Sequence, residues 1–306
     1  MPTVRNVLPN LDALALFVAI VEGGSLSAAA RKLGVHQPNA SRALKQLERE
    51  LGVTLVNRST TGTVPTEAGR QFAERARVLL NEAAYFSNWC NQLTSTTSAQ
   101  LEVVASMTIS EFLLPRWLTA FAKDSPGVKV TVDVGNSTHV LQNVEVGKAA
   151  LGFIETTLIP TRVNKKHLGG DYLLVVVAPG HPWAERTSKV SLEELAATPL
   201  VTREAGSGTR ESFTEILARH LPGVPIAEPA HVVSSNAAVR IAVQTGSSPA
   251  VLSQHAVQAQ LDNGTLLQVP TEIALGRPLT AVWKGDLTPA ARALIDVAAT
   301  SFPTMR

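Results

Sequence analysis

Polar side chains gather along one side of the segment between residues 37 and 51. Read as a helix, this segment has one apolar face with residues at i, i+4, i+7 and i+11, namely Ala40, Leu44, Leu47 and Leu51. The opposite face carries amide, hydroxyl and cationic groups, namely Gln37, Ser41, Arg42, Lys45 and Arg49. Such groups reach base edges and phosphates in DNA. The pattern therefore predicts a DNA-reading helix, and a small helical bundle with a solvated basic face is the alternative.

A second set of polar residues recurs in four turns farther along the chain. These turns are Ser106-Met107-Thr108, Asn136-Ser137-Thr138, Ala205-Gly206-Ser207-Gly208-Thr209 and Ser234-Ser235-Asn236. A helix N-terminus presents free N–H groups and favours an anion by about 0.3 to 1 kcal/mol. Each turn alone is an ordinary helix cap. Four of them around one inferred cleft predict a site for a small polar molecule, expected to be an anion.

Two charged residues next to these turns bear on the charge of that molecule. Arg203 would supply a cation for a carboxylate or phosphate. Glu155, at the end of an expected strand, would oppose an anion unless it is protonated or paired with Arg203. Glu155 could instead bind an amine or hydroxyl group.

The elements that position the first set are short helices and a hairpin. Apolar spacing predicts a helix over 11–22, and the segment 25–34 reads as a second helix with a serine N-cap and a glycine stop. The tight turn 34–36 then leads into the polar helix, which makes a helix-turn-helix. Segments 55–58 and 63–65 around the turn 59–62 predict a hairpin wing, on which Arg58 would meet phosphate; a solvated Arg58 is the alternative.

A long helix is expected after the hairpin, capped by Thr66. Its apolar residues step by four and three, as in a heptad seam: Phe72, Ala76, Leu79, Ala83, Phe86, Cys90 and Leu93. A helix of roughly 27 residues is about 40 Å long at 1.5 Å per residue, too long for one small domain to cover. We therefore expect the seam to meet a partner chain, with Cys90 as a packing residue.

The polar segment 94–99 predicts a hinge, and the chain beyond it alternates strand and helix. Strands are expected at 101–105, 128–134 and 151–154, with helices over 112–122 and from 136 to 146. A second such unit begins with a strand at 171–177 and has helices from 192, over 209–220 and over 236–244. Further strands are expected near 200–201, at 266–269 and at 279–283, before a last helix over 289–299. This alternation predicts a largely parallel sheet.

Several stretches of the N-terminal part resemble the LysR-type transcriptional regulators: Phe17 to Ala30, Gln37 to Ser41, Leu47 to Gly52 and Thr66 to Gly69. The stretch from Thr202 to Arg210, with 111–115 and 135–137, is similar to a subgroup that includes regulators of carbon-fixation and sulfur-assimilation genes. One departure is His36, where the family usually has Ser or Thr, so the recognition helix should start less firmly capped.

The resemblance implies an α/β chain with three parts. These are a winged helix-turn-helix DNA-binding domain (1–65), a linker helix for dimerisation (66–94) and a two-lobed effector domain like the periplasmic binding proteins (95–306). Lobe I would span about 99–163 and 270–306, and lobe II about 164–269. The expected DNA-binding residues are Ser27, Gln37, Pro38, Asn39, Ser41, Arg42, Lys45 and Arg58. The expected effector-binding residues are Ser106, Met107, Thr108, Asn136, Glu155, Arg203, Ser207, Gly208, Thr209 and Asn236.

Composition narrows the class of protein. Across 306 residues the net charge is +2, but residues 1–93 carry ten Lys/Arg against seven Asp/Glu, a modestly basic front. The single cysteine excludes an internal disulfide and a Cys-based zinc site within one chain. No secretory signal and no membrane-spanning apolar run is visible, so a cytoplasmic location is expected.

Three kinds of function fit these features to different degrees. A ligand-responsive regulator that binds double-stranded operator DNA and assembles as a dimer or tetramer fits them best. A solute-binding protein fits the α/β part but not the basic front or the missing signal. An α/β enzyme is disfavoured, because the histidines show no metal-ligand spacing and Gly206-Ser207-Gly208 lacks the nucleophile-elbow and phosphate-loop patterns. We expect no metal and no cofactor.

Overall fold

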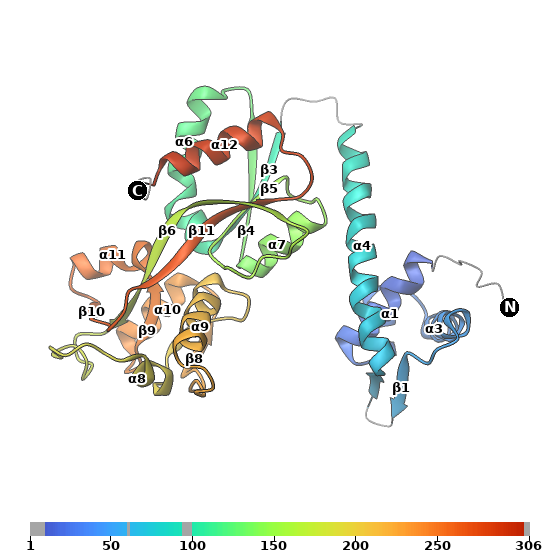
Figure 1. Cartoon of the computed structure of the whole chain (residues 1–306), viewed down its shortest axis with the longest axis horizontal. Helices are drawn as coiled ribbons and strands as arrows, with labels where there is room; N and C mark the ends of the chain where they lie inside the picture. The colour runs from blue at the N-terminus through green and yellow to red at the C-terminus, as the bar shows by residue number, and fades with distance from the viewer. Residues whose placement is uncertain (1–9, 60–61, 94–99, 303–306) are drawn as a thin grey trace. The chain divides into compact units, whose positions relative to one another are not determined.

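The computed structural model describes residues 10–59, 62–93 and 100–302 (Figure 1). The chain divides into two compact units, Met1–Asn91 and Gln92–Arg306. The expected hinge at 94–99 and the residues before position 10 lie outside the described ranges.

The first unit begins with three helices, α1 (Leu11–Gly23), α2 (Leu26–Lys32) and α3 (Gln37–Leu51). The Oγ of Ser25 accepts a hydrogen bond from the N–H of Ala28 at 3.4 Å, so Ser25 is the predicted N-cap of α2. Small residues let the helices approach closely, because Ala29 and Ala40 are 1% exposed. The unit's core is apolar and includes Leu14, Phe17, Ile20, Leu44, Leu47 and Leu55.

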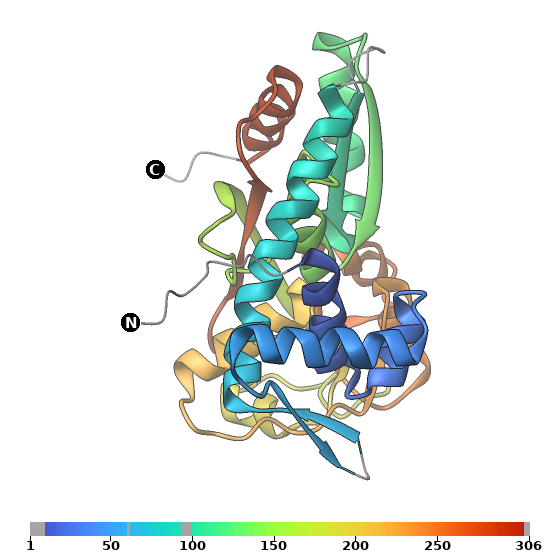
Figure 2. The ribbon, with the colours of Figure 1, turned by 90° about the vertical axis from the view of Figure 1, so that its right-hand side faces the viewer.

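Strands β1 (Val56–Ser59) and β2 (Gly62–Pro65) form the predicted antiparallel hairpin (Figure 2). Glu48 on α3 fixes its start, because its Oε1 accepts hydrogen bonds from the N–H groups of Leu55 (2.7 Å) and Val56 (3.2 Å). The wing is thus attached directly to the polar helix, and the winged helix-turn-helix fold is confirmed.

The long helix α4 (Glu67–Leu93) starts at the predicted cap, where the Oγ1 of Thr66 accepts from the N–H of Gly69 at 2.9 Å. Its heptad seam, however, is not one continuous surface. Phe72 packs edge-on against Phe17 at 5.5 Å, and Ala76 is buried in the same core. Farther along, Leu79 is 42% exposed and Phe86 62%. The first part of the seam therefore covers its own domain, and only the later part is free to meet another chain.

A nine-stranded sheet forms the centre of the second unit, with eight strands in the order β4-β3-β5-β11-β6-β9-β7-β8 and β10 paired with β6. The strands are β3 (Gln100–Ser106), β4 (Lys129–Gly135), β5 (Leu151–Ile154), β6 (Asn164–Val177), β7 (Val201–Arg203), β8 (His231–Val233), β9 (Ala250–Ser253), β10 (Leu267–Val269) and β11 (Leu275–Trp283). Two lobes share this sheet. The long strands β6 and β11 run through both, because Leu168 and Leu279 lie in one apolar core and Leu173 and Leu275 in another.

Lobe I contains β3, β4 and β5, and lobe II contains β7, β8, β9 and β10. The helices of lobe I are α5 (Met107–Phe112), α6 (Leu114–Asp124), α7 (Ser137–Glu145) and α12 (Pro289–Thr300). Those of lobe II are α8 (Leu192–Ala197), α9 (Gly208–His220), α10 (Asn236–Thr245) and α11 (Gln254–Asp262).

Three features of this unit differ from the sequence-based expectation. The strands β6 and β11 are antiparallel to their neighbours, so the sheet is mixed and not largely parallel. The segment 112–122 was expected to lie in one helix, but a separate helix, α6, begins at Leu114. Pro115 lies in the first turn of α6, where its lack of a backbone N–H removes no hydrogen bond. The strands β8 and β9 and the helix α11 were not predicted.

Candidate functional site

The exposed side of α3 carries most of the residues expected to contact DNA. Gln37, Pro38, Asn39, Arg42 and Lys45 are exposed, whereas Ser27 and Ser41 are half-buried. His36 occupies the N-cap position without a side-chain hydrogen bond, as expected for a histidine in place of Ser or Thr. Arg58 lies on β1 opposite Thr63, and its side chain is outside the described part. A helix with an amide and cationic face beside a wing can enter a major groove.

In the second unit, Arg203 at the end of β7 is the centre of a polar network between the lobes. It is 3% exposed. Its Nε and Nη2 donate to the two carboxylate oxygens of Glu204 at 2.8 and 3.0 Å, and its Nη1 donates to the Oδ1 of Asn236 at 3.0 Å. The guanidinium is therefore already bound on two sides by groups of its own lobe.

This network reaches lobe I at two points. The Nδ2 of Asn136, the N-cap of α7, donates to Glu204 at 3.3 Å, while its Oδ1 accepts from the N–H of His139. The Nδ2 of Asn236 donates to the Oε2 of Glu111 on α5 at 3.1 Å. Hydrogen bonds thus run from α5 through lobe II to α7, and they join the two lobes across the candidate site.

Glycines allow the lobes to approach this closely. Gly206 has φ +85, and a Cβ there would lie 2.7 Å from the Oγ1 of Thr138. At Gly208, the first residue of α9, a Cβ would lie 2.6 Å from the Oγ of Ser137 and 2.8 Å from the Oε2 of Glu155. The N-termini of α7 and α9 therefore meet where any larger residue would separate them.

Beneath this contact lies a buried ion cluster built on Arg277. Its Nε and Nη2 donate to the Oδ2 of Asp171 at 2.9 and 2.6 Å, and its Nη1 donates to the Oγ1 of Thr209 at 3.0 Å. Arg277 and Asp171 face each other across β11 and β6, and both side chains are fully buried. Glu155 completes the cluster, with its Oε1 3.9 Å from the Nη2 of Arg277 and its Oε2 accepting from the Oγ of Ser137.

Of the possibilities left open for Glu155, pairing with Arg203 is not found in the structure. Arg203 binds the adjacent Glu204, whereas Glu155 lies beside Arg277. Arg277 and Asp171 were missed by the sequence reading. The sequence did contain a sign of this pair. Asp171 points to the same side of its strand as the buried residues Leu173 and Val175, and a charged residue on a buried face requires a buried partner of opposite charge.

The turn after β3 contributes the remaining polar groups. Ser106 and Thr108 are each 2% exposed, and Met107 is half-buried. The Oγ of Ser106 is buried and has no hydrogen-bond partner among the described residues. Burying a hydroxyl without a hydrogen-bond partner costs about 1 to 3 kcal/mol of stability, so a ligand atom that forms a hydrogen bond with this oxygen would be favourable. Ser207 is also 2% exposed and makes no side-chain cap.

Two carboxyl groups next to this site have perturbed pKa values. Burial alone would raise the pKa of Glu204, but the hydrogen bonds and positive charge of Arg203 outweigh it and hold the pKa below its usual value. Burial raises the pKa of Glu211 on α9, and hydrogen bonds from Thr156 and the backbone of Gly206 offset this only in part. Glu204 is therefore ionised at neutral pH and remains bound to Arg203.

Within the described ranges, no three His, Cys, Asp or Glu side chains lie close enough together to hold a metal ion. In the same part of the chain, no helix has the length and apolarity needed to cross a membrane.

Two family models match the chain. Residues 11–70 match the bacterial regulatory helix-turn-helix proteins of the lysR family, and residues 94–303 match the LysR substrate binding domain. An uncharacterized HTH-type transcriptional regulator of Mycobacterium tuberculosis, Rv2282c, is 40% identical over 95% of both chains. CysL of Bacillus subtilis is 31% identical over 82% of both chains. A probable RuBisCO transcriptional regulator of Thalassiosira pseudonana is 29% identical over 92% of this chain and 93% of its own.

Solved structures share the fold. The regulatory domain of CcmR from Synechocystis, in complex with 2-PG, has a TM-score of 0.60 at 21% identity and covers 68% of this chain and 99% of its own. HinK, a LysR family regulator from Pseudomonas aeruginosa, has a TM-score of 0.56 at 24% identity and covers 98% and 100%. The expected subgroup is confirmed by CysL and the RuBisCO regulator. The helix-turn-helix head, the two-lobed α/β unit and both family matches identify this chain as a LysR-type transcriptional regulator.

Proposed function

We propose that this DNA-binding regulator senses a small polar metabolite, an anion, bound between the lobes of its second unit. The observation that carries the proposal is the hydrogen-bonded network from Glu111 through Asn236, Arg203 and Glu204 to Asn136, which crosses the cleft twice. The binding residues would be Ser106, Met107, Thr108, Asn136, Glu155, Arg203, Ser207, Gly208, Thr209 and Asn236. Buried and mutually bonded polar groups from two lobes can exchange partners with a ligand when the lobes move.

Glu204 gives this site a defined exchange step. Its carboxylate occupies the guanidinium edge of Arg203 that a ligand carboxylate or phosphate would use. An anionic effector must displace Glu204, and displacement also releases the Asn136 bond to lobe I. Ligand binding would thereby replace one interlobe contact by another. Such an exchange alters DNA binding only as far as the ligand prefers one arrangement of the assembly.

The ligand's charge is supported by the way the buried carboxylates are arranged. Asp171 binds Arg277 directly, and Glu155 lies beside the same guanidinium. Neither carboxylate therefore faces an incoming anion without a compensating cation. CcmR, solved in complex with 2-PG, has the same fold and supports a site for a small anion here.

For the DNA, we propose that α3 reads a major groove through Gln37, Pro38, Asn39, Ser41, Arg42 and Lys45, with Ser27 and the wing residue Arg58 close to phosphates. Support comes from the exposure of five residues on α3. We assign residues 1–65 to the DNA-binding domain, 66–94 to the linker helix and 95–306 to the effector domain. The protein would act by binding and not by catalysis, in the cytoplasm, where operator DNA is found.

Self-association through α4 is part of the proposal. Leu79, Phe86 and Trp89 are exposed on this helix, at 42%, 62% and 46%. An apolar stripe of this kind on a long helix suits pairing with a second copy. Leu79→Glu should break that pairing, because it would bury an unpaired charge. Light scattering should show a smaller assembly, and an unchanged mass would refute pairing along this stripe.

Isothermal titration calorimetry with a panel of metabolites tests the effector site. Thr108→Val keeps the shape of a buried side chain and removes its hydroxyl. The best wild-type ligand should bind this variant about five- to tenfold more weakly, the size expected for one lost hydrogen bond of about 1 kcal/mol. Thr119→Val on α6 is the matched control and should bind as wild type does. If Thr108→Val bound that ligand as tightly as wild type does, Thr108 would not belong to the effector site.

A further inference from the structure

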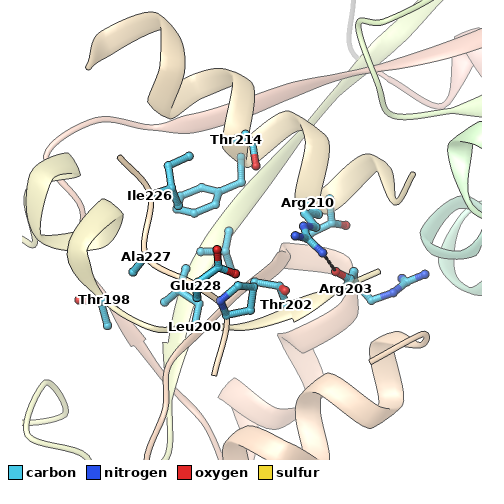
Figure 3. A pocket seen from close by; sticks show the side chains of 13 residues that line it. Thr198, Leu200, Thr202, Arg203, Arg210, Thr214, Ile226, Ala227 and Glu228 are labelled. Atoms are coloured by element: carbon cyan, nitrogen blue, oxygen red, sulfur yellow. Dashed lines mark hydrogen bonds between the residues drawn. The ribbon is translucent and has the colours of Figure 1, made fainter. Parts of the chain in front are cut away.

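A cavity of about 210 Å³ opens at the surface of lobe II, next to the interlobe network (Figure 3). It opens between α9, β7 and the segment 226–229. Its wall is mostly apolar, formed by Leu200, Phe213, Ile226, Ala227, Pro229 and Val251. The volume is smaller than the roughly 300–1,000 Å³ of pockets for drug-sized ligands, so only a small molecule fits.

Two opposite charges line this cavity without binding each other. In Figure 3 the guanidinium of Arg210 and the carboxylate of Glu228 point into the same space. The only hydrogen bond that Arg210 makes to the described residues is from its Nη1 to the carbonyl of Arg203, at 3.2 Å. Glu228 makes no hydrogen bond or ion pair with any residue in the described part of the chain. Both head groups are therefore available to a ligand.

An unsatisfied hydroxyl lies beside them. The Oγ1 of Thr202 is buried, lines the same cavity and has no hydrogen-bond partner among the described residues. Burying a polar atom without a partner is unfavourable, and a ligand atom placed here would satisfy it. The cavity thus combines one cation, one anion and one free hydroxyl with an apolar wall.

Arg203, at the end of β7, faces this cavity with its backbone and the interlobe network with its side chain. At Arg203 the carbonyl receives the bond from Arg210, while the guanidinium extends to Glu204 and Asn236. Figure 3 shows the Arg203 side chain directed away from Arg210 and Glu228. The two sites therefore adjoin at Arg203 and Thr209, which also line the cavity, whereas Arg210 and Glu228 belong to the cavity alone.

We propose that this cavity is a second small-molecule site, which binds an α-amino acid with an apolar side chain. Arg210 would bind the α-carboxylate, Glu228 the α-ammonium group, and the Leu200–Phe213–Ile226 wall the side chain. A simple anion would use Arg210 alone, and a simple cation would use Glu228 alone. A neutral apolar molecule would use neither charge, so a ligand with both charges and an apolar side chain fits this lining best.

Calorimetric titration of the full-length protein with L-leucine as the probe tests this site. Leucine should bind, and three truncated analogues should each bind at least about tenfold more weakly, equivalent to about 1.4 kcal/mol. Isocaproate lacks the ammonium group, isoamylamine lacks the carboxylate and glycine lacks the side chain. Absence of leucine binding, or equal binding of any one analogue, would overturn the assignment.

Two variants locate the probe. Glu228→Gln should weaken leucine binding at least about tenfold, and since Glu228 is an exposed residue the variant should fold. Glu185→Gln removes the same charge from an exposed position outside the cavity and should leave leucine binding unchanged. Leucine binding that survives Glu228→Gln but is lost in Thr108→Val would place the amino acid between the lobes and overturn the proposal.

Discussion

The face of α3 and the interlobe network carry similar kinds of side chain in opposite states. On α3, Gln37, Arg42 and Lys45 are exposed to water. Between the lobes, Arg203 and Arg277 are 3% exposed, and both are bound by carboxylates of the same chain. The proposed DNA-binding face is thus exposed to water, whereas the interlobe residues bind one another.

This difference follows from where each partner comes from. DNA would bind an exposed surface, and exposed cations stay hydrated at little cost in free energy before it binds. A buried charge without a partner is strongly unfavourable, because its desolvation costs several kcal/mol per ion. A buried effector site must therefore contain its own substitute for the ligand, and in the proposed site Glu204 takes the place of an anion beside Arg203.

The largest difference between the regions should appear in stability. Arg277→Met leaves the buried carboxylates of Asp171 and Glu155 without their cation. We expect a loss of about 3 to 5 kcal/mol in the free energy of unfolding. The matched change on α3, Arg42→Met, should alter it by no more than about 0.5 kcal/mol, because Arg42 is exposed. Urea denaturation measures the free energy of unfolding of both variants. Equal losses in the two variants would contradict the proposed difference between the regions.

The next effect concerns DNA. Arg42→Ala and Gln37→Ala should each weaken operator binding by about 1 to 3 kcal/mol, the cost of a lost base contact, without loss of fold. Gel-shift titration at one fixed salt concentration measures this, with circular dichroism as a check on folding. Arg116→Ala, at an exposed position on α6, is the control for removal of a positive charge. If both α3 variants bound DNA as tightly as wild type, α3 would not be the reading helix.

The same contrast explains how far the sequence could be read. The α3 face depends on residues a few positions apart, so helical spacing alone placed Gln37, Ser41, Arg42 and Lys45 together. The polar turns after the strands were also found, because Asn136 and the glycines at 206 and 208 have local signatures. Short-range patterns were sufficient for both.

Long-range pairing was beyond such patterns. Arg277 and Asp171 are 106 positions apart and meet only because β6 and β11 pair in register. For a related reason the sequence left the partner of Glu155 open, with Arg203 as one possibility. Only the antiparallel crossing strands bring Arg277 to Glu155.

The smallest effect tests the central claim, that an anionic effector displaces Glu204 from Arg203. Glu204→Gln removes the competing charge, so the best carboxylate or phosphate ligand from the metabolite panel should bind about tenfold more tightly, equivalent to about 1.4 kcal/mol. Glu185→Gln, which removes a carboxylate at an exposed position, should bind as wild type does. Calorimetric titration of the three proteins under identical conditions gives the answer. Weaker binding to Glu204→Gln would contradict the account, because Glu204 would then hold the ligand and not stand in its place.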